Sequence, residues 1–284
     1  LAGFTLKIEK GESFVIIGQS GIGKTVALRH VAGLLNPDSG RGLVEGVQVN
    51  GARPAAMRKL RERMGVLFQS GALINWMTVA ENVALPLAEH RRFPKKEIER
   101  QVDEKLELLE LADAKYKTPS EISGGMKKRV ALARVLMSNP AIILYDEPTT
   151  GLDPIRKNGV LSLIAQSRQT FGFTALMVSH DIPDVFRIAA RVALLDGGRI
   201  VFDGTPDEIL ATDHEYGAMD RLWMFIAEKT GARYIRQPIP LPATTPGALI
   251  EALWAGVNER TRVLFISHIT SPTALIFPVE EICR

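Results

Sequence analysis

The segment GQSGIGKT, at residues 18–25, constrains the fold of this chain more than any other feature. It fits the pattern G-x-x-x-x-G-K-[ST]. The apolar residues 13–17 before it predict a buried strand, and residues 26–35 after it carry apolar side chains at helical spacing. A strand, a glycine-rich loop and a helix in this order predict an α/β domain whose loop wraps around a phosphate group.

The residue types in this loop suit the phosphates of a nucleotide. Its glycines let the backbone bend so that successive N–H groups point at one phosphate. Lys24 would neutralise charge on the β- and γ-phosphates, and Thr25 would place a hydroxyl on Mg²⁺. The loop residues expected to bind the nucleotide are Gly18, Gln19, Ser20, Gly21, Gly23, Lys24 and Thr25.

A second segment, residues 122–153, adds an anion site and two carboxylates. Ser123-Gly124-Gly125 opens a predicted helix, and a helix N-terminus attracts anions. The apolar residues 141–145 predict a strand that ends in Asp146 and Glu147. We expect Asp146 to hold Mg²⁺ through water and Glu147 to polarise the attacking water as a general base.

The remaining candidates have simpler interpretations when each is taken alone. The pair Asp146-Glu147, followed by proline, could merely cap the next turn. Gln69 in VLFQSGAL is typical of a solvated loop glutamine, and a strand-end histidine such as His180 is typical of a structural residue. Beside the phosphate loop and the carboxylates, His180 is instead interpreted as a γ-phosphate sensor.

In this order the motifs resemble those of ABC ATPases, over residues 1 to about 210. The matching motifs are the loop 18–25, Gln69, ISGGM at 122–126, Asp146-Glu147, Gly151-Leu152-Asp153 and His180. The segments VLFQSGAL, TVAENVALPL, SGGMKKRVALARVL and YDEPTTGLDP are similar to the ATPase of Mla-type lipid-trafficking transporters. Met126, in place of the commoner glutamine, is typical of that branch.

The resemblance implies an ATPase that works as a pair, either a homodimer or two related chains. Two copies would face head to tail, with ATP between the loop 18–25 of one and Ser123-Gly124-Gly125 of the other. Asp153 would contribute to nucleotide binding, and Gln69 would link Mg²⁺ and the attacking water to a separate transmembrane permease. The catalytic residues would be Glu147, His180 and Gln69, and the metal would be held by Thr25, Gln69 and Asp146. Phospholipid transport from the cytoplasmic face of the inner membrane is the expected setting.

Composition agrees with a protein partner. A net charge of +3 is too small to argue for nucleic acid, and the single cysteine, Cys283, excludes an internal disulfide. No segment is typical of a signal peptide or of a membrane span. Residues 76–135 resemble a helical subdomain, with helical spacing over Lys95–Ala114. Leu73, Trp76, Met77 and Val79 would either receive the permease or pack into the core, with even odds.

The start of the chain departs from the family pattern. The family stacks adenine on an aromatic residue upstream of the first strands, whereas Leu1 already lies past that point and Phe4 lies too far along. We therefore expect an N-terminally truncated domain that lacks an edge strand. Loss of one base–aromatic stack predicts that the affinity for ATP falls about tenfold or more.

Residues 212–284 depart from the family as well. TDHEYGAMDRLW and RVLFISHITSPTALIFPVEEI resemble a fragment of class V aminotransferases, fold-type I PLP enzymes. The resemblance places His214 on the cofactor ring and residues 268–271 near it. By this resemblance the Schiff-base lysine would lie further on than Arg284, and Lys229, expected in mid-helix, is in the wrong place, so we expect no PLP-dependent activity. The expected elements are a helix at 216–230, a strand at 233–237, a helix at 246–256, a strand at 262–267 and a helix after Pro278.

The sequence therefore predicts an ABC nucleotide-binding domain at residues 1–211 and an incomplete α/β segment at 212–284. A chimaera is preferred over a regulatory C-terminal domain, because half a domain leaves strands unpaired. A soluble ABC protein of translation or DNA repair is a competing interpretation. The translation type carries two phosphate loops and the repair type splits its motifs with a coiled coil, whereas this chain has one loop and contiguous motifs.

Overall fold

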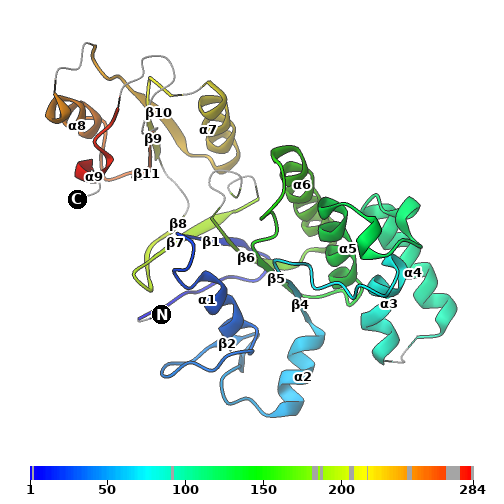
Figure 1. Ribbon diagram of the computed structural model, residues 1–284. Coiled ribbons are helices and arrows are strands. Elements are labelled where there is room, and N and C mark those ends of the chain that lie inside the picture. The colour runs from blue at the N-terminus through cyan, green and yellow to red at the C-terminus, as the bar shows by residue number, and fades with distance from the viewer. Residues whose placement is uncertain are drawn as a thin grey trace. The chain divides into compact units, whose positions relative to one another are not determined.

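The chain folds into two compact units, Leu1–Asp203 and Gly204–Arg284. Figure 1 shows the computed structural model, which describes residues 1, 3–90, 93–180, 185, 188–204, 208–215, 217–241, 245–266 and 276–282. The boundary predicted after residue 211 lies inside the second unit, in strand β9, and stays a prediction of where the two resemblances meet.

A six-stranded sheet forms the centre of the first unit, in the order β4-β5-β6-β1-β7-β8. The first five strands in this order are parallel to their neighbours. Short strands β2 and β3 pair separately and antiparallel. The strands are β1 (Ser13–Ile17), β2 (Leu43–Val44), β3 (Val47–Gln48), β4 (Met64–Leu67), β5 (Ile142–Asp146), β6 (Thr174–Ser179), β7 (Arg191–Asp196) and β8 (Arg199–Gly204).

The register of the central strands brings the functional motifs to one edge of the sheet. Strand β1 is buried along its whole length between β6 and β7, as an uninterrupted apolar run predicts for a parallel strand. Ile17 pairs with Ser179, and Asp146 pairs with Val178. The carboxyl ends of β1, β5 and β6 therefore meet, and the loop 18–25, Glu147 and His180 follow directly from them.

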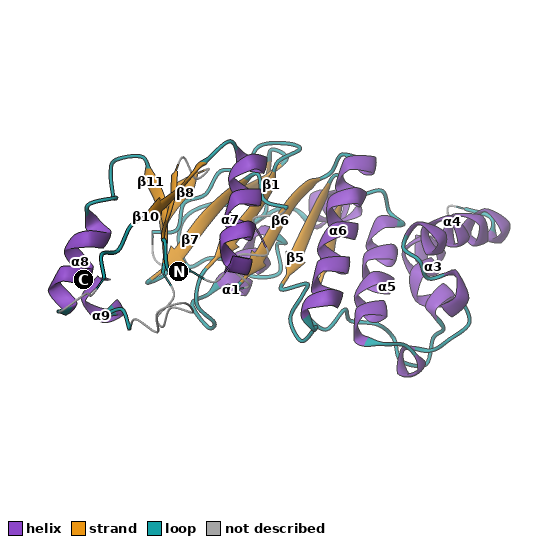
Figure 2. Cartoon of the chain, turned by 90° about the horizontal axis from the view of Figure 1, so that it is seen from above, coloured by secondary structure: helices purple, strands orange, loops and turns teal. Residues whose placement is uncertain are grey.

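Helices cover both faces of this sheet (Figure 1). Helices α1 and α2 lie on one side, and α5 and α6 lie on the other. Helices α3 and α4 pack with α5 beyond the end of the sheet, as Figure 2 shows. The helices are α1 (Lys24–Val31), α2 (Pro54–Glu62), α3 (Val79–His90), α4 (Lys95–Leu108), α5 (Gly124–Leu136) and α6 (Pro154–Phe171), with 3-10 turns at Ala112–Ala114 and Pro119–Glu121.

Two predicted helices are shorter in the structure than their apolar spacing indicates. The helix expected at 26–35 begins at Lys24 and ends at Val31. Gly33 takes the left-handed conformation (φ 63°) and the Leu34 amide donates to the Arg29 carbonyl, a typical helix stop. The helix expected at 95–114 ends at Leu108, because Glu110 turns the chain with a φ of 56°.

The second unit contains three parallel strands in the order β10-β9-β11, with helices between them. The helices and strands predicted here are confirmed, whereas β9 was missed. Lys229 lies next to the end of α7 and not in mid-helix. Residues 268–271 and Cys283 lie outside the described residues. The elements are β9 (Glu208–Thr212), α7 (Gly217–Thr230), β10 (Arg233–Gln237), α8 (Pro246–Trp254), β11 (Thr261–Phe265) and α9 (Val279–Ile282).

The third strand gives the large apolar side chains of this unit a surface to pack on. With only two strands, the large side chains would lack a surface to pack on. Trp223 and Phe277 are instead fully buried, and the Trp223 ring lies 5.3 Å from that of Phe265. Trp254, in contrast, remains 46% exposed.

A buried tyrosine in β5 gives a stability prediction. Among the described residues, nothing forms a hydrogen bond with the Tyr145 hydroxyl, and burial raises the pKa of this group. Because an unpaired buried hydroxyl is destabilising, Tyr145→Phe is expected to stabilise the protein by about 1 kcal/mol. Denaturant unfolding measures this. Tyr116→Phe, at a side chain 79% exposed, is the matched control and is expected to change nothing. A loss of stability in Tyr145→Phe would show that the hydroxyl has a partner.

No helix in the described ranges combines the length and the apolar character that a membrane span requires.

Candidate functional site

The loop 18–25 leaves its backbone open toward the carboxyl edge of the sheet. A Cβ atom at Gly18 would lie 2.6 Å from the carbonyl oxygen of Leu195, so no side chain fits there. Gly21 and Gly23 take φ angles of 81° and 106°, which favour glycine. Gln19 and Ser20 lie exposed at the tip of the loop. The structure therefore places the predicted loop residues in the strand–loop–helix arrangement that phosphate binding needs.

Lys24 is the buried cation of this site. Its side chain is 4% exposed, and its Nζ donates hydrogen bonds of 2.8 Å to the carbonyls of Gly18 and Gln19. The same Nζ lies 3.6 Å from Oε1 of Glu147. The loop thus holds an ammonium group next to the carboxylate that follows β5.

Thr25 and Asp146 form the second contact between the loop and β5. The Thr25 hydroxyl donates a 2.7 Å hydrogen bond to Oδ1 of Asp146. A hydroxyl and one carboxylate are the oxygen donors with which proteins hold Mg²⁺ beside a nucleotide, where phosphates and water complete the coordination. The donor set present here fits this ion.

Hydrogen bonds and ion-pair contacts hold Glu147 at the end of β5. Its backbone takes φ 47°, and its N–H donates to the Val178 carbonyl at 3.1 Å. Oε2 accepts a 2.8 Å hydrogen bond from the Thr150 hydroxyl and lies 2.9 Å from Nδ1 of His180. Burial raises the pKa of Glu147, but the Thr150 and His180 hydrogen bonds and the nearby Lys24 outweigh it, so the pKa lies below its ordinary value. The carboxylate is therefore ionised at neutral pH.

The other predicted nucleotide contacts lie at two helix starts. The Ser123 hydroxyl caps α5 by accepting the Met126 amide at 3.3 Å, and Asp153 caps α6 by accepting the Arg156 amide at 3.0 Å. This hydrogen bond lowers the pKa of Asp153. Gly124 is exposed and Gly125 buried. Within the described residues, no hydrogen bond joins these helix starts to the loop 18–25.

Gln69 follows β4, with an exposed side chain. Its backbone carbonyl accepts a hydrogen bond from Nζ of Lys128, a buried residue of α5. Sequence analysis did not identify Lys128 or Thr150 as residues of this site. Thr150 carried a detectable signal, three residues after Glu147 in a turn, whereas Lys128 resembles an ordinary charged helix residue.

Comparisons with known proteins agree with this geometry. The sequence model of the family "ABC transporter" matches residues 1–150. The methionine import ATP-binding protein MetN of Latilactobacillus sakei is 40% identical over 261 residues, 92% of this chain and 72% of that protein. The intermembrane phospholipid transport ATP-binding protein MlaF of Haemophilus influenzae is 39% identical over 205 residues, 72% of this chain and 78% of that protein. This chain belongs to the ABC transporter family.

A solved structure of an ABC cassette has the same fold. The ATP-binding cassette MJ0796, determined as a dimer in a post-hydrolysis state with ADP and Pi, has a TM-score of 0.65 at 32% identity. The match covers 70% of this chain and 88% of that one. The predicted α/β fold of a P-loop ABC ATPase is thereby confirmed, and the nucleotide of this ABC cassette is ATP, with Mg²⁺.

The cassette exposes two large aromatic side chains on neighbouring segments. Trp76 is 83% and Tyr116 is 79% exposed. The amides of Val79 and Ala80 donate to the carbonyls of Lys117 and Lys115, which brings the two segments together. Val79 is fully buried, and Leu73 and Met77 are half-buried. Val79 therefore packs into the core, whereas Trp76 lies at the surface, where a permease could contact it.

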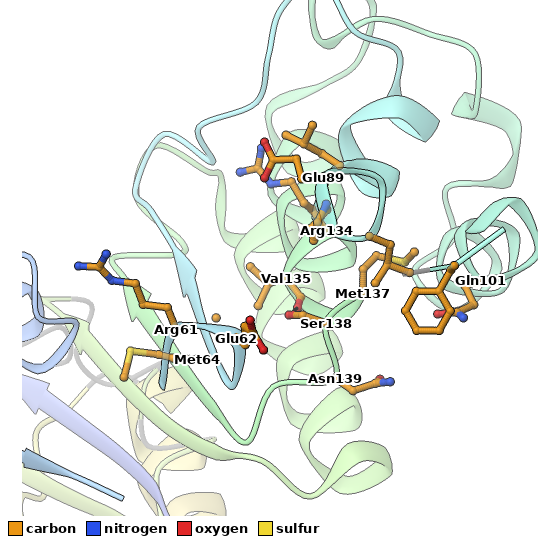
Figure 3. A pocket seen from close by; sticks show the side chains of 15 residues that line it. Arg61, Glu62, Met64, Glu89, Gln101, Arg134, Val135, Met137, Ser138 and Asn139 are labelled. Atoms are coloured by element: carbon orange, nitrogen blue, oxygen red, sulfur yellow. Dashed lines mark hydrogen bonds between the residues drawn. The ribbon is translucent and has the colours of Figure 1, made fainter. Parts of the chain in front are cut away.

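The cassette also has a cavity of about 650 Å³ where α2, β4, α3 and α5 approach one another (Figure 3). Figure 3 shows Glu89, Arg134 and Gln101 among the side chains around it. Its wall is made of both polar and apolar side chains. None of the predicted nucleotide-binding residues lines it, so the cavity is not the ATP site.

Proposed function

We propose that this ABC cassette hydrolyses ATP in composite sites of a dimer and energises the movement of a phospholipid, or a related hydrophobic substrate, through a separate permease. The observation that carries the ATPase part is the cluster at one sheet edge, where Thr25 donates to Asp146 and where Glu147 lies within ion-pair distance of both Lys24 and His180.

Each residue of the cluster has one task. Lys24 neutralises charge on the terminal phosphates, because its ammonium is already held beside the loop backbone. Glu147 accepts a proton from the attacking water, and Thr150 and His180 fix the orientation of its carboxylate. Thr25 and Asp146 would hold Mg²⁺, which supplies Lewis-acid stabilisation of phosphate charge when bound. Gln69, in the loop after β4, would link Mg²⁺ and the attacking water to the permease.

In the proposed composite site, the helix start of one chain meets the phosphate loop of another. The N-terminus of α5 presents Ser123 and Gly124, and an exposed helix start is suited to an anion. The nucleotide bound by the loop 18–25 of the same chain would lie at another helix start, that of α1. A second copy, placed head to tail, would supply its nucleotide to α5. The dimeric form of MJ0796 supports this arrangement.

Support for a lipid substrate comes from the MlaF relatives. The protein of Escherichia coli K12, which is named for intermembrane phospholipid transport, is 40% identical over 207 residues and 77% of its length is covered. Met126 in the helix start, where glutamine is commoner, is typical of that branch. The cassette would then act peripherally, at the cytoplasmic face of the inner membrane.

Methionine import is the second candidate, and one observation favours it. The alignment with MetN of Latilactobacillus sakei covers 92% of this chain, whereas the alignments with MlaF proteins cover 72–73%. The longer alignment supports an importer with a C-terminal extension.

Co-expression separates the two substrates. The cassette would be produced with the tagged permease of a phospholipid transport system and, separately, with that of a methionine importer. Retention on the lipid-type permease, together with Mg²⁺-dependent ATP hydrolysis by that complex, is expected. Retention on the methionine-type permease alone would replace the lipid proposal, and a complex that never hydrolyses ATP would overturn the ATPase assignment.

The exposed aromatic residues are proposed to receive the permease. Trp76→Ser is expected to weaken binding to the permease about tenfold or more, since buried tryptophans dominate interfaces. Basal ATP hydrolysis is expected to stay unchanged. Binding to the detergent-solubilised permease measures the effect. Trp254→Ser, at an exposed tryptophan of the second unit, is the matched control, and equal losses in both variants would contradict the assignment.

For residues 212–284 we infer an aminotransferase-like fragment without chemistry of its own. The parallel strands and the helices between them support this inference, and a regulatory domain is the alternative. Deleting residues 212–284 is expected to leave the Kd for ATP unchanged, measured with a fluorescent analogue. The whole chain mixed with PLP is expected to show no aldimine absorbance. Loss of ATP binding or of dimerisation in the shortened chain would favour the regulatory domain.

A further inference from the structure

The turn that follows Gln69 is fastened to α5 by two cationic side chains. Lys128 donates from Nζ to the carbonyl of Gln69. Arg134 donates from its two terminal nitrogens to the carbonyls of Gly71 and Ala72, both at 2.8 Å. Three of four successive carbonyls in residues 69–72 thus accept hydrogen bonds from one helix.

The backbone of this turn needs such support. Gly71 and Ala72 have φ angles of 76° and 46°. Alanine rarely adopts the left-handed conformation, and such a residue persists only where its surroundings hold it. The planar guanidinium of Arg134 uses a separate nitrogen for each of the two carbonyls, and its rigid geometry fixes the spacing between these donors.

Lys128 is buried within the electrostatic reach of Asp146 and Glu147. It is 7% exposed, and its burial lowers the pKa of its ammonium group, while the charges of Asp146 and Glu147 oppose this. The side chain is therefore held in the field of both carboxylates while it donates to Gln69.

The far end of the loop is fastened by a third side chain. Asn82 of α3 is fully buried, accepts the Ile74 amide at 2.8 Å and donates to the carbonyls of Ile74, Met77 and Thr78. Residues 69–78 are thus anchored to α5 at one end and to α3 at the other.

We propose that Lys128 and Arg134 are positioning residues for Gln69, and that they make the Gln69 turn and α5 move as one body. Helix α5, which has Ser123 at its N-terminus, then takes the Gln69 turn with it when it moves. The inference rests on the proposed function, since it assigns to these residues an effect on Gln69 during ATP hydrolysis.

The first test measures, without ATP, whether Lys128 and Arg134 hold the turn at residues 69–72. These two side chains and their hydrogen bonds to the turn are called the clamp. Amide hydrogen exchange of peptides covering residues 69–77 is measured in the full, nucleotide-free chain. Arg134→Met and Lys128→Met are expected to speed this exchange about tenfold. Arg134→Lys, which keeps the charge but loses the paired donors, is expected to be intermediate. Arg129→Met is the matched control, because Arg129 lies on the same helix but pairs with Glu110. Unchanged exchange in both Lys128 and Arg134 variants would overturn the clamp.

The second test asks whether the two residues act through Gln69. Each substitution is expected to lower kcat about tenfold, because misplacement of a catalytic group is costly, with the Kd of ATP within about twofold. In a Gln69→Ala background the same substitutions are expected to lower kcat less than about twofold further. Equal effects in both backgrounds would overturn the positioning role. A wild-type chain without ATP hydrolysis would sink the proposed function instead, and the exchange result would still decide the clamp.

Discussion

Glu147→Gln is expected to lower ATP turnover by about 10²-fold or more while the Kd for ATP stays within about twofold. The amide keeps the shape of the carboxylate and its hydrogen bond with Thr150, but it cannot accept a proton from water. Because the nucleotide is bound but not cleaved, an ATP-bound dimer is expected to accumulate. Phosphate release measures turnover, and size-exclusion chromatography with ATP measures the dimer.

The matched control for this substitution is Glu110→Gln. Glu110 lies on the surface and pairs with Arg129, so the same change of charge there is expected to leave turnover unaffected. Near-normal turnover in Glu147→Gln would show that Glu147 is not the general base. His180 and Asp146 would then be the groups to examine.

Two inactive variants are expected to restore each other when mixed. Lys24→Ala removes the buried ammonium that is proposed to neutralise the terminal phosphates, and Ser123→Arg places a bulky cation at the start of α5. In a mixed dimer, the intact loop of one chain meets the intact helix start of the other. Random pairing predicts about a quarter of the wild-type rate, because half of the dimers carry one working site out of two.

Each variant alone is the control for this mixture, at the same total concentration. A mixture no more active than either variant shows that the sites are not shared between chains. Analytical ultracentrifugation with ATP separates this result from a failure to dimerise.

The sequence predicted the strands that carry the motifs because each is a short apolar run ending in a polar signature. The runs before Gly18, Asp146 and His180 all form parallel strands of the sheet. Strand β9 was missed because EILAT, a short apolar run, fits a helix or a strand equally well. Its central place between β10 and β11 depends on residues far along the chain, which local spacing does not report.

The residues proposed to bind phosphate follow from residue type and spacing, whereas those that hold other residues in place do not. Lys24, Thr25 and Glu147 belong to motifs whose chemistry requires them. Lys128 and Arg134 sit in an ordinary amphipathic helix, and only the packing of α5 against the turn after β4 shows that they point inward. Lys128 and Arg134 have a structural role because they donate to backbone carbonyls. These carbonyls belong to a segment about 60 residues earlier in the chain, so local spacing does not report them.

The position of β1 has a consequence for how this protein is made. It is the first strand of the six-stranded sheet in the chain, yet it lies between β6 and β7, with Ser13 paired to Ala175 and Phe14 to Arg191. On the ribosome, the apolar segment 13–17 therefore emerges long before either neighbour exists. Such late, non-local pairing slows folding and leaves apolar surface uncovered in the nascent chain. We expect synthesis of this cassette to depend on chaperones until residues near 191–196 have left the ribosome.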